Sequence, residues 1–429
     1  MNRWIGAAYG SVGHTAELVA ALMPQGVGGK VGRTFSSRRG LRRRYEEWGR
    51  KTRDRSRPLL WMHAASVGEA MMALPVLQRV RRSMPLVQTA FTFFSPSAEL
   101  FAHQMGVDFS DYLAFDTASS ARTALAALDP TAIVFSKGDV WPALVREAAA
   151  QDVRLGIVSA SMPSGSMRAS RIGALLTRDA YGSLDAIGAA SSADAESLVR
   201  AGAREGRVRV TGDTRYDQAW SRAHTGARNT ALVGGLRVPR PTLVAGSTWP
   251  SDERHLLSAW RTVRANLPTA RIVIAPHELT PPHLASLERW ARDESLSCAG
   301  LDAAGPETDV VLVDRMGVLA ELYDLATVAY VGGGFQDAGL HSLVEPAVFG
   351  IPVLIGPNSA RSRDAQLMLR SGGAITAHDA GELSRLAQRL MSDSRERADR
   401  SEAIGAVVAA ELGAADRSFE IVRELLRTV

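Results

Sequence analysis

Short apolar runs alternate with amphipathic stretches along most of the chain, in two separate series. The first begins at Leu59 and runs through LLWMHAA, VQTAFTFF, YLAF, AIVFS, RLGIVSA and DAIGAA. The second begins with TLVAGS at 242–247 and continues through RIVIAP, DVVLVD, TVAYVGGG, IPVLIGP and GAITA. Short buried strands separated by amphipathic helices are typical of a parallel α/β sheet. The sequence therefore predicts an α/β protein with two doubly wound, Rossmann-like domains.

The chain has 429 residues, more than a single core usually serves. We expect an N-terminal helix and basic arm over 1–57 and a first domain over 58–212. A linker follows at 213–240, within a stretch that is polar at both ends and closes with Pro239 and Pro241. A second domain with C-terminal helices is expected over 241–429. Ligands of such sheets bind beyond the carboxyl ends of the strands. We therefore expect the substrate site in a cleft between two facing domains.

The net charge of +5 is unevenly distributed, because residues 1–60 hold 13 basic and 4 acidic side chains. This arm is either a solvated segment or one attracted to an anionic membrane surface. The apolar residues before it are interrupted by His14 and Glu17, and a spanning helix needs about 20 mostly apolar residues, so we expect a helix that lies on the membrane. No nucleic-acid motif accompanies the basic residues, and we expect no nucleic-acid partner.

Two strand ends in the first domain carry groups suited to catalysis. In HAASVGEA, Glu69 falls in the first turn of the helix that follows a strand. It is either a glutamate that complements the helix dipole or a general base. In FSKGDVWP, Lys137 stands at another strand end and is one of only three lysines in the chain. It is either an ordinary surface lysine or a functional one.

Four strand ends in the second domain predict a nucleotide site. GSTWPSDE offers Ser247 at a helix N-terminus, and IAPHE offers Pro276 and His277. DRMGVL offers a turn at Met316 and Gly317 whose backbone could read a base edge. GGGFQDAGLHSLVEP offers a glycine loop with Gly333 and Gly334, followed by Ser342 and Glu345. Glycines allow close approach of the backbone to a ligand, and one carboxylate can accept hydrogen bonds from both hydroxyls of a ribose.

Absent motifs narrow the type of nucleotide enzyme. There is no G-x-x-x-x-G-K-[ST], which disfavours a Walker ATPase, and the glycine loop does not read G-x-G-x-x-G, which disfavours a dinucleotide dehydrogenase. No D-x-D occurs, no histidines have zinc-ligand spacing, and Cys298 is the single cysteine. We therefore expect no metal and no cofactor, and the pattern favours a nucleotide-sugar glycosyltransferase of the two-domain GT-B type.

The segment WMHAASVGEAMMALPVLQRVR resembles the N-terminal signature of the bacterial Kdo (3-deoxy-D-manno-octulosonic acid) transferases, and the glycine-to-glutamate stretch resembles their nucleotide-binding segment. VTGDTRYD, VAGSTWPSDE, IAPHE, VDRMGVLAELYDLATVAYVGGGF and PVLIGPN follow in the family's order and spacing. The resemblance implies a GT-B fold and transfer of Kdo from CMP-Kdo to a lipid A precursor. It implies that the enzyme works at the cytoplasmic face of the inner membrane, peripherally or anchored by its N-terminus.

The resemblance also implies roles for individual residues. Glu69 would be the proton acceptor, and Lys137 and Arg215 occupy two positions that support the transition state. The family usually has a glutamate at the first of these and a lysine at the second. The contacts to CMP map to Pro276 and His277, to Met316, Gly317 and Val318, and to Ser342, Leu343, Val344 and Glu345. His277, Val318 and Ser342 replace an arginine, a glutamate and an asparagine, which indicates a variant branch of the family.

The resemblance implies one direct displacement that inverts the anomeric configuration, with Glu69 as general base and a lipid A precursor as acceptor. Two alternatives stay open on the sequence. One is another GT-B nucleotide-sugar enzyme, such as a lipid A disaccharide synthase-like transferase or an epimerase. The other is a non-catalytic nucleotide-binding or membrane scaffold protein.

Overall fold

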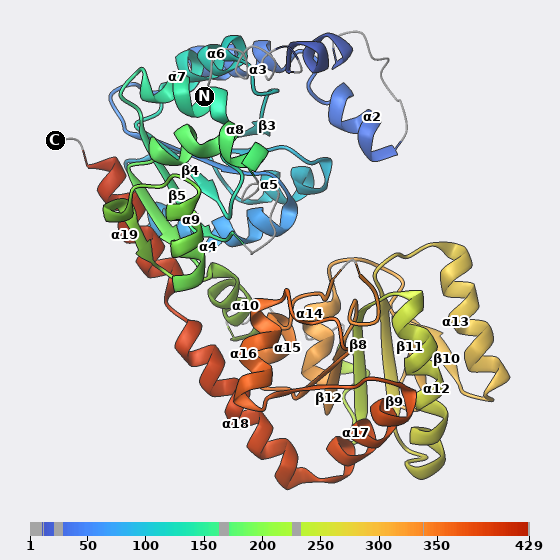
Figure 1. The fold of residues 1–429 in the computed structure, drawn as a ribbon. Coiled ribbons are helices and arrows are strands. Elements are labelled where there is room, and N and C mark those ends of the chain that lie inside the picture. The colour runs from blue at the N-terminus through green and yellow to red at the C-terminus, as the bar shows by residue number, and fades with distance from the viewer. Residues whose placement is uncertain are drawn as a thin grey trace. The chain divides into compact units, whose positions relative to one another are not determined.

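The computed structural model describes residues 11, 13–20, 29–162, 171–224, 233–337 and 339–427. The chain forms two compact units, one of Met1–Gln218 with Leu412–Val429 and the other of Ala219–Glu411 (Figure 1). The change of unit falls inside helix α10 (Thr214–His224), within the segment expected to be a linker. The last helix, α19 (Ala414–Leu426), belongs to the first unit, although the sequence pattern placed the whole C-terminal tail in the second.

The first unit is built on a parallel seven-stranded sheet in the order β3-β2-β1-β4-β5-β6-β7. Its strands are β1 (Leu59–Ala64), β2 (Gln88–Phe93), β3 (Phe109–Tyr112), β4 (Ala132–Ser136), β5 (Arg154–Ala160), β6 (Ala186–Ala189) and β7 (Val208–Val210). Every residue of β1, β2 and β4 is buried, which explains why these strands read as unbroken apolar runs.

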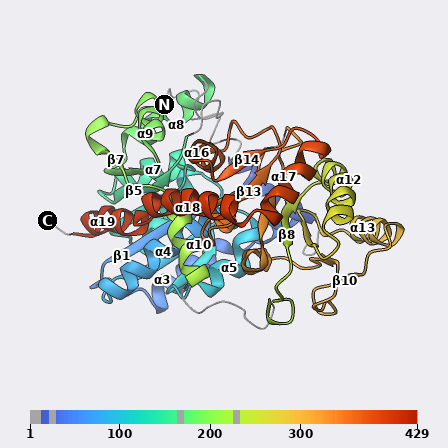
Figure 2. The same cartoon turned by 90° about the horizontal axis from the view of Figure 1, so that it is seen from below.

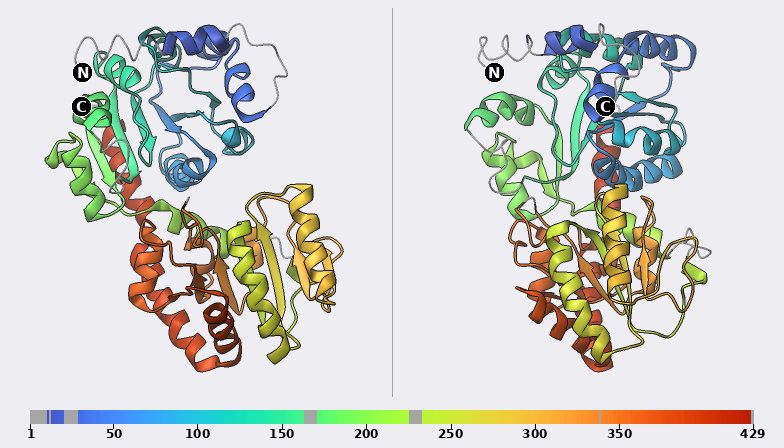
Figure 3. Two further views of the ribbon diagram at one scale, coloured as in Figure 1. Left: turned by 45° about the vertical axis from the view of Figure 1, so that its right-hand side comes forward. Right: turned by 90° about the vertical axis from the view of Figure 1, so that its right-hand side faces the viewer.

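Helices cover both faces of this sheet (Figure 3). They are α2 (Gly29–Ser36), α3 (Leu41–Lys51), α4 (Val67–Ser83), α5 (Glu99–Gln104), α6 (Ala118–Leu128), α7 (Pro142–Ala149), α8 (Arg171–Gly182), α9 (Ser192–Arg200) and α19, with short 3₁₀ turns at Pro96–Ala98 and Glu205–Arg207. Residues 13–20 are also helical. No helix in the described ranges is both long and apolar enough to cross a bilayer.

Two glycines in the sheet explain why α19 packs on the first unit. A Cβ atom on Gly156 of β5 would lie 2.4 Å from the Cδ1 of Leu425, and one on Gly188 of β6 would lie 3.0 Å from the Cδ1 of Ile421. The missing side chains leave room for the helix, and its apolar face joins the core of this unit. Figure 1 shows α19 beside α4 and β5.

The basic arm is part of the first unit and is not a free segment. Leu41 and Tyr45 of α3 are buried in its core. The guanidinium of Arg38 is stacked 4.1 Å from the ring of Phe94 and donates to the carbonyl of Leu113 at 2.8 Å. Arg44 pairs with Asp111 at 2.7 Å. Part of the excess of arginine therefore serves packing. The membrane helix expected before the arm falls largely in 1–10, 12 and 21–28, outside the described residues.

The second unit contains another parallel seven-stranded sheet, in the order β10-β11-β9-β8-β12-β13-β14. Its strands are β8 (Thr242–Thr248), β9 (Arg271–Pro276), β10 (Cys298–Gly300), β11 (Val310–Leu312), β12 (Val328–Val331), β13 (Val353–Ile355) and β14 (Ala374–Thr376). The two sheets confirm the predicted doubly wound α/β class of the GT-B type.

The helices of the second unit are α12 (Pro250–Asn266), α13 (Pro281–Asp293), α14 (Leu319–Leu322), α15 (Val344–Ala347), α16 (Arg363–Ser371), α17 (Ala380–Ser392) and α18 (Ser394–Glu411), with a 3₁₀ turn at Tyr323–Leu325. On one face of the sheet α12 and α17 pack together (Figure 2). Trp260 of α12, Leu287 of α13 and Leu390 of α17 share one core with the strands.

Both sheets have a topological switch point, where successive connections leave in opposite directions. In the first sheet this point lies between β1 and β4, and in the second it lies between β8 and β12. Loops that diverge from two neighbouring strands leave a crevice beyond their carboxyl ends, and ligands of open α/β sheets bind there. Glu69 and Lys137 follow the two strands of the first switch point. Ser247, near the end of β8, and the glycine loop after β12 lie at the second.

Candidate active site and nucleotide site

Glu69 is buried in the first turn of α4, just beyond the end of β1. Its Oε2 accepts a hydrogen bond from the backbone N–H of Ala65 at 2.7 Å. Ala65 precedes the N-cap residue Ser66, so this bond joins the loop after β1 to the first turn of α4. The carboxylate thus has a structural contact and lies at the switch point, and its role as a general base stays a prediction.

Lys137 directly follows β4 and is exposed. Its φ of 71° lies in the left-handed region, which side chains other than glycine, asparagine and aspartate rarely adopt. Backbone bonds hold it there, because its N–H donates to the carbonyl of Val158 at 3.0 Å and its own carbonyl accepts from Ser161 at 2.9 Å. Uncommon conformations held by their surroundings are concentrated at functional sites.

Arg215 lies at the start of α10 and is paired with Asp213. Its Nε and Nη2 donate to the Asp213 Oδ2 at 2.9 and 2.6 Å, and its backbone N–H donates to Oδ1 at 2.9 Å. The side chain of Asp213 is 4% exposed, whereas that of Arg215 is 35% exposed. The guanidinium is therefore oriented by a buried carboxylate and remains partly accessible.

Two hydrogen bonds to α4 bring the three catalytic candidates of the first unit together. The hydroxyl of Ser136, which precedes Lys137, donates to the carbonyl of Glu69 at 3.0 Å. The hydroxyl of Thr214, which precedes Arg215, donates to the carbonyl of Met72 at 2.7 Å. Segments separated by more than sixty residues in the sequence are thus fixed to the first turns of one helix.

Backbone N–H groups of the glycine loop in the second unit donate hydrogen bonds to other parts of that unit. Gly332 donates to the carbonyl of Gly246 at 2.9 Å. Gly333 and Phe335 donate to the buried carboxylate of Asp252, at 2.8 and 3.2 Å. These N–H groups are therefore not available to cradle a phosphate, contrary to the usual use of such loops. Asp252 also accepts from the hydroxyl of Tyr330 at 2.8 Å.

The loop contains glycines because the backbone approaches other backbone there. Gly333 has a φ of 94°, and a Cβ on it would lie 2.2 Å from the carbonyl oxygen of Gly339. A Cβ on Gly334 would lie 2.5 Å from the backbone nitrogen of Gly356. A larger residue at either position would displace the chain that follows β12.

Glu345 lies in α15, which follows the glycine loop, and is partly buried. Burial raises the pKa of its carboxyl; the nearby carboxylate of Glu321 adds to the rise and Arg222 opposes it. No described residue contributes a hydrogen bond or ion pair to the Glu345 carboxylate. A partly buried carboxylate without such a partner is left to water in the free protein, and a ligand that excludes this water must supply donors in its place.

Arg222 of α10 binds the predicted nucleotide segment that follows β11. It donates to both oxygens of Glu321, at 2.8 and 2.9 Å, and to the carbonyl of Gly317 at 2.7 Å. Gly317 has a φ of 86°, and the neighbouring Met316 side chain is 74% exposed. The turn at 316–318 is thereby fixed beside the group that acts electrostatically on Glu345.

The other predicted nucleotide residues lie at the same edge of the second sheet. Ser247 is the penultimate residue of β8 and has a φ of 53°, and Pro276 ends β9 and is followed by His277. The hydroxyl of Ser342 donates to Asp364 at 3.0 Å, and Leu343 and Val344 are buried behind it. The structure therefore brings together residues that follow β8, β9, β11 and β12, which are adjacent strands.

Sequence reasoning missed several polar residues that organise this edge: Arg222, Trp249, Asp252, Glu321 and His341. Asp252 carried the clearest signal, because it follows Pro250 in a helix-start pattern that suggests only a local cap. It does accept from the N–H of Trp249 at 3.0 Å, as a cap would. Its second role on the glycine loop, 81 residues away, leaves no local mark.

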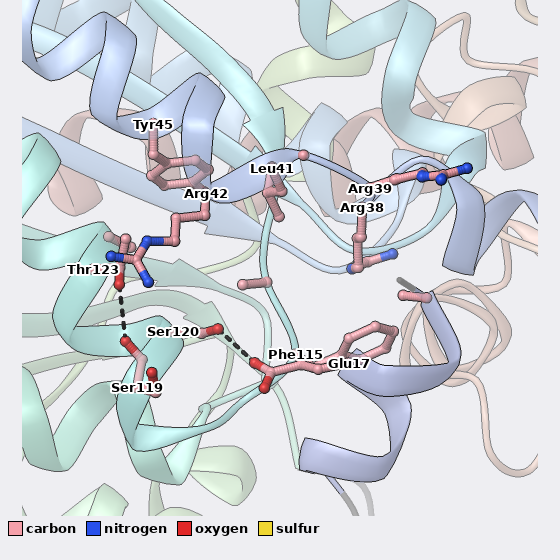
Figure 4. A pocket seen from close by; sticks show the side chains of 14 residues that line it. Glu17, Arg38, Arg39, Leu41, Arg42, Tyr45, Phe115, Ser119, Ser120 and Thr123 are labelled. Carbon is pink, nitrogen blue, oxygen red and sulfur yellow. Dashed lines mark hydrogen bonds between the residues drawn. The ribbon is translucent and has the colours of Figure 1, made fainter. Parts of the chain in front are cut away.

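A separate cavity of about 460 Å³ opens in the first unit between residues 17–20, α3 and α6 (Figure 4). Glu17 points toward α6, where the hydroxyls of Thr117 and Ser120 donate to its Oε1. The guanidinium of Arg38 lines the cavity, and burial lowers its pKa to about 10. A neighbouring groove of about 670 Å³ is lined by Arg42, Arg50, Arg53, Arg55 and Arg122. No predicted catalytic residue lines either space.

The two parallel seven-stranded sheets, each with a switch point, define an α/β protein with a fold of the GT-B type. Residues 35–218 match the family model described as 3-Deoxy-D-manno-octulosonic-acid transferase (kdotransferase). A 3-deoxy-D-manno-octulosonic acid transferase of Bordetella pertussis is 30% identical over 379 residues, covering 86% of this chain and 87% of the relative. One of Aquifex aeolicus is 27% identical over 318 residues, covering 73% and 80%. The chain belongs to the 3-deoxy-D-manno-octulosonic acid transferase family.

Solved structures of similar fold include the UDP-GlcNAc 2-epimerase of Neisseria meningitidis bound to UDP-GlcNAc. It has a TM-score of 0.62 at 13% identity and covers 86% of this chain and 99% of the epimerase. That likeness extends to the fold alone. The family relationship, which rests on sequence over most of the chain, is what defines the enzyme as a Kdo transferase.

Proposed function

We propose that this enzyme transfers Kdo from CMP-Kdo to a lipid A precursor of the lipid IVA type, in lipopolysaccharide core biosynthesis. The observation that carries the proposal is the similarity to the Bordetella pertussis transferase over 86% of the chain. The geometry at the two switch points supports the individual roles assigned below. The proposed site of action is the cytoplasmic face of the inner membrane.

The proposed reaction is one displacement at the anomeric carbon of Kdo. Glu69 takes the proton of a sugar hydroxyl on the acceptor while the oxygen of that hydroxyl forms the new glycosidic bond. The bond between the anomeric carbon and the CMP phosphate breaks, and its electron pair leaves with CMP. One displacement inverts the configuration, and the step requires no metal. Arg215, oriented by Asp213, and Lys137 are proposed to stabilise the negative charge that develops.

The proposed nucleotide site lies at the carboxyl edge of the second sheet. Glu345 accepts hydrogen bonds from the ribose hydroxyls, which would supply the donors that its carboxylate lacks among the described residues. The turn at Met316–Val318 presents exposed backbone to the base. Ser247, Pro276 and His277 complete the edge. Gly333 and Gly334 keep the chain after β12 close to the sheet, so that Glu345 is correctly placed.

The donor assignment is tested by ligand-induced stabilisation. A ligand that binds the native state at 100 times its Kd stabilises by about 2.7 kcal/mol. We expect CMP to raise the Tm of the protein and UDP to leave it unchanged at equal concentration. Stabilisation by UDP and not by CMP would contradict the donor assignment and favour a UDP-sugar enzyme.

The role of Glu69 is tested by Glu69→Gln. A general base contributes typically 10²–10⁴-fold, so turnover is expected to fall by about that factor while the affinity for CMP is retained. Glu196→Gln is the matched control, because Glu196 is exposed on α9 in the same unit. Normal turnover in Glu69→Gln, with normal folding, would rule out the assignment.

We further propose that the arginine-lined groove beside α3 and α6 holds the enzyme on an anionic membrane surface. Basic residues near such a surface contribute about 1 kcal/mol each. Deletion of residues 1–50 would also remove Leu41 and Tyr45 from the core, so charge reversal is the cleaner test. The double variant Arg50→Glu/Arg55→Glu is expected to bind vesicles containing anionic lipid more weakly, with unchanged affinity for CMP. Unchanged vesicle binding would contradict this part of the proposal.

A further inference from the structure

Three aromatic rings meet at the carboxyl ends of three neighbouring strands in the second unit. Trp249 follows β8, His277 follows β9, and His341 follows the glycine loop after β12. The rings of Trp249 and His277 are stacked at 4.3 Å, and those of His277 and His341 lie 4.6 Å apart. The indole Nε1 of Trp249 lies 3.1 Å from the Nε2 of His341. All three side chains are partly buried.

The hydrogen bond to Trp249 fixes the tautomer of His341. An indole N–H can only donate, so the Nε2 of His341 must accept and carry no proton. A neutral ring then carries its proton on Nδ1. Burial lowers the pKa of His341, and His277 lowers it further while Asp252 opposes the shift, which favours the neutral ring. The Nδ1 of His341 contacts no hydrogen-bond partner among the described residues.

The segment 341–345 therefore offers a nucleotide two kinds of polar group. The hydroxyl of Ser342 donates a hydrogen bond to Asp364, and its oxygen accepts one from the backbone N–H of Val344. The Nδ1–H of His341 is a hydrogen-bond donor, and the carboxylate of Glu345 is an acceptor. A nucleotide presents the complementary pair, since its phosphate oxygens accept hydrogen bonds and its ribose hydroxyls donate them.

We propose that His341 binds the phosphate of the donor nucleotide through its Nδ1–H, and that Trp249 is a positioning residue that fixes the ring and its tautomer. This inference rests on the proposed function, because it assumes that CMP binds at this edge of the sheet. The N–H groups of Gly332 and Gly333 are used within the protein. In a phosphate-binding loop such backbone N–H groups would donate to the phosphate. Here the Nδ1–H of His341, at the end of the same loop, is the donor.

Two substitutions of His341 distinguish a ligand contact from a structural one. His341→Asn places an N–H near the position of Nδ1 but cannot reach Trp249. His341→Gln places an acceptor near the position of Nε2 but lacks the Nδ1–H. If His341 binds the phosphate, the asparagine variant retains its affinity for CMP within about threefold, and the glutamine variant loses about tenfold or more. If His341 serves only to hold Trp249, the order is reversed.

The measurement is calorimetric titration with CMP, on variants whose Tm shows that they fold. His378→Ala, an exposed histidine of the same unit, is the control and is expected to bind CMP normally. Trp249→Phe keeps a ring against His277 but removes the indole N–H. It is expected to weaken CMP binding several-fold and to shift the NMR-observed tautomer of His341 away from Nδ1–H. Equal affinity in both His341 variants, or the reversed order, overturns the inference. Absence of CMP binding in the unsubstituted protein would instead overturn the donor assignment.

Discussion

Replacing Glu345 by glutamine should change ligand affinity and stability in opposite directions. The pKa of this carboxyl is raised chiefly by burial, which means that the folded protein disfavours the charged form. Near neutral pH the ionised side chain therefore destabilises the protein in the absence of ligand. A neutral amide of the same shape removes that cost, and the Tm of Glu345→Gln without ligand should rise.

The affinity for CMP should fall in the same variant. A hydrogen bond to a charged group contributes about 1.5–3 kcal/mol, and every 1.4 kcal/mol is tenfold in Kd. The amide oxygen of glutamine can accept a hydrogen bond from one ribose hydroxyl. The second ribose hydroxyl would face the amide NH₂, which is itself a donor, so the second hydrogen bond is lost. We therefore expect CMP to bind about 10-fold to 100-fold more weakly. A purely structural glutamate would lose stability on substitution and leave the Kd for CMP unchanged.

The pH dependence gives a second readout for Glu345. An acid whose folded-state pKa is raised holds its proton more tightly in the folded state than in the unfolded state. Its contribution therefore makes stability fall as pH rises from the ordinary glutamate range through the raised pKa. The free energy of unfolding of both proteins can be measured by chemical denaturation from the ordinary glutamate pKa to the raised pKa. It should fall with rising pH in the unsubstituted enzyme and stay constant in Glu345→Gln. A parallel pH profile in the two proteins, or a lower Tm in the variant, would refute the reasoning.

Three further substitutions test the packing that positions the sites. Asp252→Asn should destabilise the second unit by at least about 2 kcal/mol, because an amide cannot accept from all the N–H and O–H groups that now donate to the carboxylate. Denaturant titration measures this loss, and an unchanged midpoint would contradict it. Gly334→Ala should cost about 1–3 kcal/mol because its Cβ would lie 2.5 Å from the nitrogen of Gly356, and a fully stable variant would show that the close approach is not required. Leu425→Ala should destabilise the first unit by about 2–5 kcal/mol, whereas a loss confined to the second unit would contradict the packing of α19 described above.

The strands of both sheets were largely predictable from the sequence because they are buried on both faces. LLWMHAA contains β1 and RIVIAP matches β9, and each strand is buried along its whole length. The strands β7 and β10 were not predicted. Both lie at the edge of a sheet, and their residues are only partly buried or exposed, so they lack an apolar run.

The predicted residues of the nucleotide site do lie along one edge of the second sheet, because the carboxyl ends of parallel strands meet there. Their contacts were not predictable. The bond from Gly333 to Asp252 spans 81 residues and that from Trp249 to His341 spans 92, and no local pattern encodes either. The glycine loop was expected to approach a ligand closely, yet the N–H groups of Gly332, Gly333 and Phe335 bond within the protein itself.

The placement of α19 shows the same limit. Its amphipathic pattern predicts a helix with one buried face. The pattern does not tell which of the two sheets leaves space for that face. That room comes from Gly156 and Gly188, which lie more than two hundred residues earlier in the chain. In the sequence they look like ordinary interruptions of apolar strands.

The most direct test of the account is whether the purified enzyme consumes CMP-Kdo only when given a lipid A precursor. Freshly prepared CMP-Kdo would be incubated with the protein, with and without a lipid A precursor of the lipid IVA type, and the release of CMP and the mass of the lipid would be followed together. A Kdo transferase of the proposed specificity should release CMP only with acceptor, in step with lipid that carries Kdo, and Glu69→Gln should lose both. A folded protein that binds CMP but gives neither product with this acceptor would contradict the central claim.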